Sequence, residues 1–371
     1  MRVTGAELLE VRLTLREPFA SSAGSRSERR ILLLRVRGEE GLEGWGECVA
    51  GETPAYSPET TETAWLVLTE LILPSVVGRE VLGPEEILAP VSWVQGHSMA
   101  KAAVEMAYWD LQGQESGVPL WELLGGSGAA VPVACAVGLQ PSREALLERI
   151  EAALERGYSA VKLKIEPGRE ADIAGAARDR FPDASLAVDA NGAYAGRDGS
   201  GLEALDRLGL LWIEQPLGRV DFLGHARLQR KLRTPICLDE SIGSPEELRL
   251  SLELGSCGAV SVKPGLVGGH RVARELHDIC RDRGIPVRCG GMLESGIGRA
   301  HNLALATLPG FTLPGDISES RRYWIRDIVT PEFELRDGRM EPPSTAGIGV
   351  APDITYILGH AVRRAEFGVM E

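Results

Sequence analysis

Five charged residues follow one another at nearly constant spacing, each at the end of an apolar run. They are Lys164, Asp189, Glu214, Asp239 and Lys263, and the steps between them are 25, 25, 25 and 24 residues. A polar residue often marks the point where a strand leaves the core, but that accounts for one or two of these charges rather than five in phase. If five consecutive strands end at one mouth, three carboxylates and at least two ammonium groups meet in one cavity.

The three carboxylates of this set predict a metal site. Without a cation they would raise one another's pKa values, and a hard divalent cation needs oxygen ligands of this kind. We therefore predict that Asp189, Glu214 and Asp239 bind a metal ion. Because no His or Cys joins the set, Mg²⁺ is favoured, with Mn²⁺ as a substitute.

The lysines predict proton transfer. Lys162 and Lys164 lie two apart on one strand, so both side chains project to the same face. Two ammonium groups close together near a divalent cation disfavour each other's protonation, so one of them can act as a base near neutral pH. Lys263 comes from four strands further round an eight-stranded ring and is expected on the opposite wall. A metal with an amine base indicates removal of a proton α to a carboxylate.

Phosphate binding is a competing use of lysines at a barrel mouth. It would need a glycine-rich loop after the last two strands, and Gly290–Gly291 is only a weak example of one.

The spacing also predicts the elements that position these residues. Each step is the length of one strand, one helix and two short loops, which indicates successive right-handed βαβ crossovers and a parallel sheet. The first barrel strand is expected at Pro132–Val137 and the eighth at Phe311–Leu313. The fold class is therefore α/β: a modified TIM barrel, (β/α)7β, with an N-terminal α+β capping domain.

The first 125 residues form the expected capping domain. Residues 1–50 read as strands, with Pro18–Glu28 as an exposed loop or a mobile lid between the first two. Helical patterns follow at 58–73, 84–94 and 98–115, the last with Ser98 as its N-cap. We expect a capping domain at 1–125, a catalytic barrel at 126–322, and a segment at 323–371 that is too short to bury its own core and packs back on the capping domain.

Composition excludes several classes of partner. The net charge of −13 and the pI near 5.1 disfavour nucleic acid and anionic membrane surfaces. No apolar run approaches the ~20 residues of a membrane span, and the N-terminus does not read as a signal peptide. The six cysteines form no CxxC pair, as in cytoplasmic proteins with reduced thiols. We expect a cytoplasmic homo-oligomer that acts on a small-molecule carboxylate.

The motifs around these residues carry a resemblance that spans nearly the whole chain. The sequence resembles the muconate-lactonizing subgroup of the enolase superfamily, and within it the o-succinylbenzoate synthase / N-succinylamino acid racemase branch. The barrel motifs are VKLKIEPG (161–168), VDANGAY (188–194), IEQPL (213–217), CLDES (237–241), VKPGLVGG (262–269), GGMLESGIGRAHN (290–302) and LPGD (313–316). The N-terminal motifs are GWGEC (44–48), TPAYSPET (53–60) and MAKAAVEMAYWDL (99–111).

The resemblance implies a role for each matched position. Lys164 matches the general acid/base on one face of the substrate, Lys263 the lysine on the opposite face, and Lys162 the lysine that tunes and orients its neighbour. The metal ligands match Asp189, Glu214 and Asp239. The residues implied in substrate binding, or in holding the groups beside it, are Asn191, Gly291, Met292, Leu293, Ser22 and Tyr56.

For a synthase, the resemblance implies Mg²⁺-dependent syn dehydration of 2-succinyl-6-hydroxy-2,4-cyclohexadiene-1-carboxylate to 2-succinylbenzoate, a step of menaquinone biosynthesis. Lys164 would take the α proton and return it to the departing hydroxyl, while Lys263 lies over the ring as a cation. For an N-acylamino acid racemase, the same two lysines exchange a proton across the substrate.

Departures from the family pattern favour the synthase. Bifunctional racemase relatives commonly carry Arg three residues past the sixth-strand lysine, where this chain has Leu266. A frequent Ser of the first barrel strand is replaced by Ala136, and an aromatic residue of the capping loop by Ala23.

Three further functions fit the sequence less well. A dipeptide epimerase usually carries Asp-x-Asp where this chain has Asp316–Ser318, and muconate cycloisomerases differ in the capping loop. A metal-binding scaffold without turnover would have no need of both Lys164 and Lys263.

Overall fold

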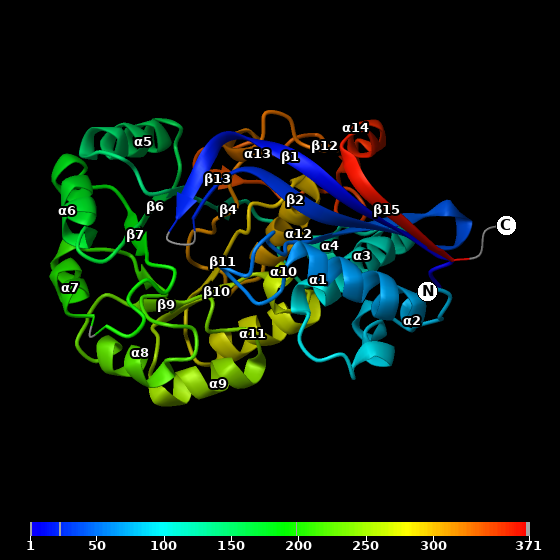
Figure 1. Cartoon of the computed structure of the whole chain (residues 1–371), viewed down its shortest axis with the longest axis horizontal. Coiled ribbons are helices and arrows are strands. Elements are labelled where there is room, and N and C mark those ends of the chain that lie inside the picture. Colours follow the sequence, from blue (N-terminus) through cyan, green and yellow to red (C-terminus); the bar gives the residue numbers. More distant parts are fainter. Residues whose placement is uncertain (1, 22–23, 198, 369–371) are drawn as a thin grey trace.

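The computed structural model describes residues 2–21, 24–197 and 199–368. A capping domain with an antiparallel sheet lies beside a curled parallel sheet ringed by helices, and the blue β1–β2 hairpin reaches from one to the other (Figure 1). The predicted α/β fold class is confirmed. In the described chain no helix has the length and apolar character needed to cross a membrane.

The parallel sheet is built from the repeating unit of the sequence. In the described residues its order is β11-β10-β9-β8-β7-β6-β5, so neighbours in space are neighbours in the chain. The strands are β5 (Ala134–Val137), β6 (Ala160–Lys164), β7 (Leu186–Asp189), β8 (Ile213–Glu214), β9 (Ile236–Leu238), β10 (Ala259–Val262) and β11 (Val287–Cys289). The helices between and after them are α5 (Arg143–Glu155), α6 (Glu170–Arg180), α7 (Ser200–Glu203), η5 (Ala204–Leu208), α8 (Phe222–Gln229), α9 (Pro245–Leu254), α10 (Pro264–Val267), α11 (His270–Asp282) and α12 (Gly296–Ala306).

The prediction of an eighth strand at Phe311–Leu313 is wrong, because these residues form no strand. The ring is instead closed by residues 313–316, which have no strand assignment but hydrogen-bond to both edge strands. Leu313 N donates to Val287 O at 3.1 Å, and Ala134 N donates to Gly315 O at 2.7 Å. Proline has no N–H to donate, so Pro314 within this segment cannot take part in a regular ladder.

The capping sheet has the order β15-β1-β2-β3 in the described residues. Its strands are β1 (Gly5–Ser21), β2 (Gly24–Arg37), β3 (Glu43–Cys48) and β15 (Ala361–Gly368). The prediction of a loop at Pro18–Glu28 is wrong for the residues that the structure describes. Beyond a bulge, Phe19 pairs with Arg26 and Ala20 with Ser25, so the two strands continue. The hairpin continues to the barrel, where Leu139 N donates to Ala20 O at 3.1 Å.

The helical part of the capping domain differs from the prediction at its ends. It contains η1 (Glu39–Gly41), α1 (Thr61–Val67), η2 (Leu68–Ile72), α2 (Leu73–Val76), η3 (Pro84–Glu86), η4 (Ala89–Val91), α3 (Ser98–Ser116) and α4 (Leu120–Leu123). Ser98 is not the N-cap of α3. Glu59 satisfies the first turn instead, accepting from Met99 N at 2.9 Å and Ala100 N at 2.8 Å, which a side chain so far away in sequence can do only through tertiary structure.

The C-terminal residues join both parts. Short elements follow the barrel: α13 (Ser320–Tyr323), β12 (Val329–Thr330), β13 (Arg339–Met340), β14 (Ala351–Pro352) and α14 (Ile354–Gly359). β13 pairs with β4 (Val131–Pro132), and β15 pairs with β1 from Gly5 to Val11. The boundaries expected at 125 and 322 stay a prediction.

Strand β3 lies between the capping helix α3 and the barrel. A Cβ at Gly46 would lie 2.0 Å from Ala103 O, so only glycine allows α3 to approach this closely. On the barrel side, Glu47 accepts from Ser295 N at 3.2 Å and Gly298 N at 3.1 Å, at the start of α12. The GWGEC motif is therefore a docking strand.

We expect Gly46→Ala to lower the free energy of unfolding by about 1–3 kcal/mol, because the added methyl group must displace the backbone of α3. Urea denaturation measures the change. Gly83→Ala is the matched control, since nothing lies within 4 Å of a Cβ there. Equal stabilities of the two variants would contradict the packing argument.

Candidate active site

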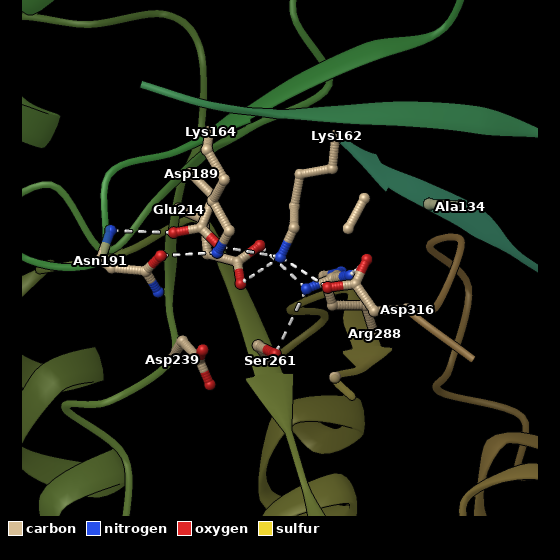
Figure 2. Close-up of polar contacts among 12 residues, drawn as sticks. Ala134, Lys162, Lys164, Asp189, Asn191, Glu214, Asp239, Ser261, Arg288 and Asp316 are labelled. Carbon is tan, nitrogen blue, oxygen red and sulfur yellow. Dashed lines mark hydrogen bonds and ion pairs between the residues drawn. The ribbon is translucent and has the colours of Figure 1, made fainter. Parts of the chain in front are cut away.

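The five regularly spaced residues lie at the carboxyl ends of neighbouring strands. β6, β7 and β8 end at Lys164, Asp189 and Glu214, which pair in register across the sheet. Asp239 and Lys263 come directly after β9 and β10. Figure 2 shows side chains of this group pointing toward one another at the strand ends.

Lys162 is the centre of a buried charge network (Figure 2). Its Nζ lies 2.9 Å from Asp189 Oδ2, 2.9 Å from Glu214 Oε1 and 2.5 Å from Asp316 Oδ2, and its side chain is 3% exposed. Burial lowers the pKa of Lys162, but the three carboxylates outweigh it and raise that pKa well above its ordinary value. These contacts favour the charged form of Lys162.

Lys164 has a different environment. Its Nζ donates to Asp189 Oδ2 and to Asn191 Oδ1, both at 2.6 Å. Asn191 Nδ2 in turn donates to Glu240 Oε1 at 2.9 Å, which fixes the orientation of the amide. Burial, together with the neighbouring Asp239 and Asp189, raises the pKa of Glu240 to about 8.

Lys263 approaches from the far side of the sheet. Its Nζ lies 2.6 Å from Asp239 Oδ2 and donates to the Tyr56 hydroxyl at 2.7 Å. Burial lowers the pKa of Lys263, but Asp239, Glu240 and Glu214 raise it above its ordinary value. The phenol of Tyr56 has its pKa raised by burial and by Asp239. Tyr56 thus brings the capping domain into contact with the lysine on the barrel.

Two members of the network were missed as site residues. Arg288 Nη1 lies 2.9 Å from Glu214 Oε2, and Arg288 Nη2 lies 2.5 Å from Asp316 Oδ1. Burial raises the pKa of Asp316, but Arg288 and Lys162 outweigh it and hold that pKa below its usual range. The signal was present for Arg288, which lies 25 residues after Lys263 and so falls in phase with the set, whereas Asp316 ends the LPGD motif out of phase.

Unusual backbone follows three of the strand ends. Asn191, Gln215 and Leu293 have φ of 45°, 35° and 61°, a region that non-glycine residues rarely adopt. Gln215 uses this turn to accept from Asp239 N at 3.0 Å through its Oε1. Such strain persists only where the surroundings determine the conformation, as at functional sites.

One cavity between the capping domain and the strand ends contains most of the predicted site. Predicted site residues line it: Lys162, Lys164, Asp189, Lys263, Asn191, Gly291, Met292, Leu293 and Tyr56. Glu214 and Asp239 lie just beneath its wall, both buried. A Cβ at Gly291 would lie 2.5 Å from Asp316 O, so glycine is required there. Ser22 and Ala23 lie outside the described residues.

The carboxylates suit a hard cation by chemistry, although ammonium groups bind them in the structure. Among the described residues, no group of three His, Cys, Asp or Glu side chains is arranged to hold a metal ion. Asp189, Glu214 and Asp239 nevertheless offer only oxygen donors, are at most 1% exposed, and leave Asp239 Oδ1 without a hydrogen-bond partner. This donor set fits Mg²⁺, and metal binding stays a prediction.

Comparisons with known proteins give matches over most of the chain. Residues 3–125 match the family model of the mandelate racemase / muconate lactonizing enzyme N-terminal domain, and residues 145–356 match the enolase C-terminal domain-like model. A Thermus thermophilus protein named N-succinylamino acid racemase is 47% identical, with 96% of each chain covered. A Geobacillus kaustophilus protein named o-succinylbenzoate synthase is 44% identical over 93% of this chain and 92% of its own. The crystal structure of an enolase superfamily member from Listeria innocua superposes with a TM-score of 0.94 at 41% identity, covering 99% of both chains.

We expect Asp316→Asn to lower the free energy of unfolding by about 3 kcal/mol, since it leaves Lys162 and Arg288 buried with one carboxylate fewer. Urea denaturation measures the loss. The control is Glu203→Gln, which removes a half-exposed pair with Lys231 at 2.9 Å and should change stability by less than about 1 kcal/mol. Similar losses of unfolding free energy in both variants would show that the buried charge network does not stabilise the mouth of the barrel.

Proposed function

Since the chain belongs to the o-succinylbenzoate synthase / N-succinylamino acid racemase family of the enolase superfamily, we propose that it is an o-succinylbenzoate synthase. It would dehydrate 2-succinyl-6-hydroxy-2,4-cyclohexadiene-1-carboxylate to 2-succinylbenzoate. One observation carries the proposal: Lys164 from β6 and Lys263 after β10 line the same cavity, beside carboxylates of the strands between them. Relatives at 42–45% identity are also named o-succinylbenzoate synthase.

The two lysines would have distinct roles. Lys164 removes the proton α to the substrate carboxylate and delivers a proton to the hydroxyl that leaves from the same face. Its contacts with Asp189 and Asn191 hold the nitrogen at the wall of the cavity, where it meets that face. Lys263, bound to Asp239 and Tyr56, would lie over the opposite face of the electron-rich ring as a cation.

Members of the enolase superfamily use Mg²⁺, and here Asp189, Glu214 and Asp239 would hold it. When bound, the cation supplies positive charge beside the substrate carboxylate and so makes the α proton acidic enough for an amine base. Lys162 and Arg288 keep the neighbouring carboxylates ionised and in place.

N-Succinylamino acid racemisation is the second candidate. It is favoured by the names of relatives at 47% and 44% identity, from Thermus thermophilus and Amycolatopsis. Both lysines would then act as acid and base, one on each face of the α carbon. Leu266, one turn after Lys263 in α10, places an apolar side chain where bifunctional relatives commonly carry Arg, and this favours the synthase. A cytoplasmic location and a homo-oligomeric state stay predictions.

We expect Lys164→Ala to lower the rate of dehydration by at least about 10³-fold while the far-UV circular dichroism stays unchanged, because the base is lost. Loss of the diene absorbance measures turnover. Lys164→Arg is the control: it keeps the charge but cannot deprotonate, so it should be as inactive as the alanine variant. Full activity in either variant would show that another residue is the base. Solvent deuterium entering N-succinyl amino acids would report the racemase activity.

We expect Mg²⁺ to raise the melting temperature of the wild-type protein by a few degrees, because a ligand that binds only the folded state stabilises it. Asp239→Asn should abolish most of this rise, whereas Asp282→Asn, at an exposed position, should keep it. Differential scanning calorimetry needs no substrate, so it tests the metal site independently of activity. If Mg²⁺ raised the melting temperature of Asp239→Asn as much as that of the wild type, Asp239 would not be a metal ligand.

A further inference from the structure

The wall of the cavity opposite the strand ends carries positive charge that the proposed chemistry does not use. Arg26 and Arg29, both on β2, line the cavity together with Gly51 and Thr53, which follow β3. The carboxylates among the described lining residues are Asp189 and Asp316, and both belong to the barrel, where lysine or arginine side chains bind them. The capping side of the cavity therefore presents two cations without a lining carboxylate.

Arg29 is the fixed member of this pair. It is 1% exposed, its Nη1 donates to Ala50 O at 2.9 Å and its Nη2 donates to Val49 O at 2.5 Å. The two carbonyl oxygens accept hydrogen bonds from its terminal nitrogens, but its Nε has no hydrogen-bond partner. Glu47 and Glu294 offset part of the charge of Arg29, but neither lines the cavity, so the guanidinium adds positive charge to this wall.

Arg26 is the half-buried member of the pair and lines the cavity. In the described part of the chain it forms no ion pair with a carboxylate, and its guanidinium lies beside Gly51, with Nη2 3.1 Å from an ideal Cβ there. Burial and the charge of Arg26 lower the pKa of Arg29, although Glu47 and Glu294 act in the opposite direction. A bound carboxylate would relieve the repulsion between the two side chains.

We propose that Arg26, together with the buried Arg29, binds the distal carboxylate of a dicarboxylate substrate and so selects succinyl-bearing substrates over neutral-chain analogues. The inference rests on the proposed function, since both candidate substrates carry a second carboxylate at the end of a succinyl chain. The barrel strand ends hold the reacting carboxylate, and the capping wall across the cavity holds the other. Arg26 is a specificity-determining residue in this scheme and takes no part in proton transfer.

The test is a binding measurement that needs no turnover. Isothermal titration calorimetry of the wild-type protein with Mg²⁺ compares 2-succinylbenzoate with 2-butanoylbenzoate, which lacks the distal carboxylate. We expect the wild type to bind 2-succinylbenzoate ~10- to 100-fold more tightly, as one charge-assisted contact predicts. Arg26→Gln should reduce this ratio of affinities to near one, chiefly by weakening the binding of 2-succinylbenzoate. Arg26→Lys should restore part of the ratio.

Arg37→Gln is the matched control, because Arg37 lies at the other end of β2 and does not line the cavity. It should leave the ratio unchanged. Equal affinities of the wild type for the two ligands, or an unchanged ratio in Arg26→Gln, would overturn the inference whatever the turnover. Carboxylate-dependent binding in a protein that dehydrates nothing would instead overturn the proposed function and leave the inference standing. In an active protein, Arg26→Gln should raise KM for the succinyl substrate with little change in kcat.

Discussion

The structure depends on the neutralisation of buried charge at the mouth of the barrel. Lys162 and Arg288 lie among Asp189, Glu214 and Asp316, and all five side chains are at most 8% exposed. Removing an ion from water costs several kcal/mol, so each of these groups is tolerable only with an opposite charge in contact. The pairing therefore fixes where β6, β7, β8, β11 and the closing segment can end relative to one another. The same pairing sets the positions of the groups proposed to do the chemistry.

Hydrogen bonds also fix the loops at the mouth of the barrel and join the barrel to the capping domain. Gln215 links the loop after β8 to Asp239, and Asn191 links Lys164 to Glu240. From the other side, Glu47 of β3 binds the start of α12. Because these contacts are satisfied within the protein, the site geometry exists before a substrate enters, and little binding energy is needed to organise it.

The sequence was sufficient for the features with a regular period. The 25-residue steps placed Lys164, Asp189, Glu214, Asp239 and Lys263 on neighbouring strand ends, because a strand and a helix joined by short loops repeat at that length. It was insufficient where a contact joins distant segments. The cap of α3 by Glu59 and the closure of the ring by residues 313–316 each depend on tertiary packing, which no local pattern records. Arg288 lies one further 25-residue step along the chain, but its period does not reveal its partners: it contacts Glu214 and Asp316 across the ring.

In the proposed function, chemistry and substrate recognition are divided between two parts of the fold. The barrel supplies the lysines and carboxylates, whereas β1, β2 and the segment after β3 supply the opposite wall of the cavity. Among the contacts described for Lys162, Lys164 and Lys263, Tyr56 is the partner from the capping side. If the proposal holds, substitutions elsewhere on that wall are expected to change which acyl chain is accepted without disturbing the charge network. Dehydration and racemisation both begin with removal of an α proton, so the difference between them must arise from how the substrate is held against the lysines. That places the determinant of the reaction in the residues that contact the unreactive end of the substrate and in the neighbours of Lys263, such as Leu266, rather than in the bases themselves.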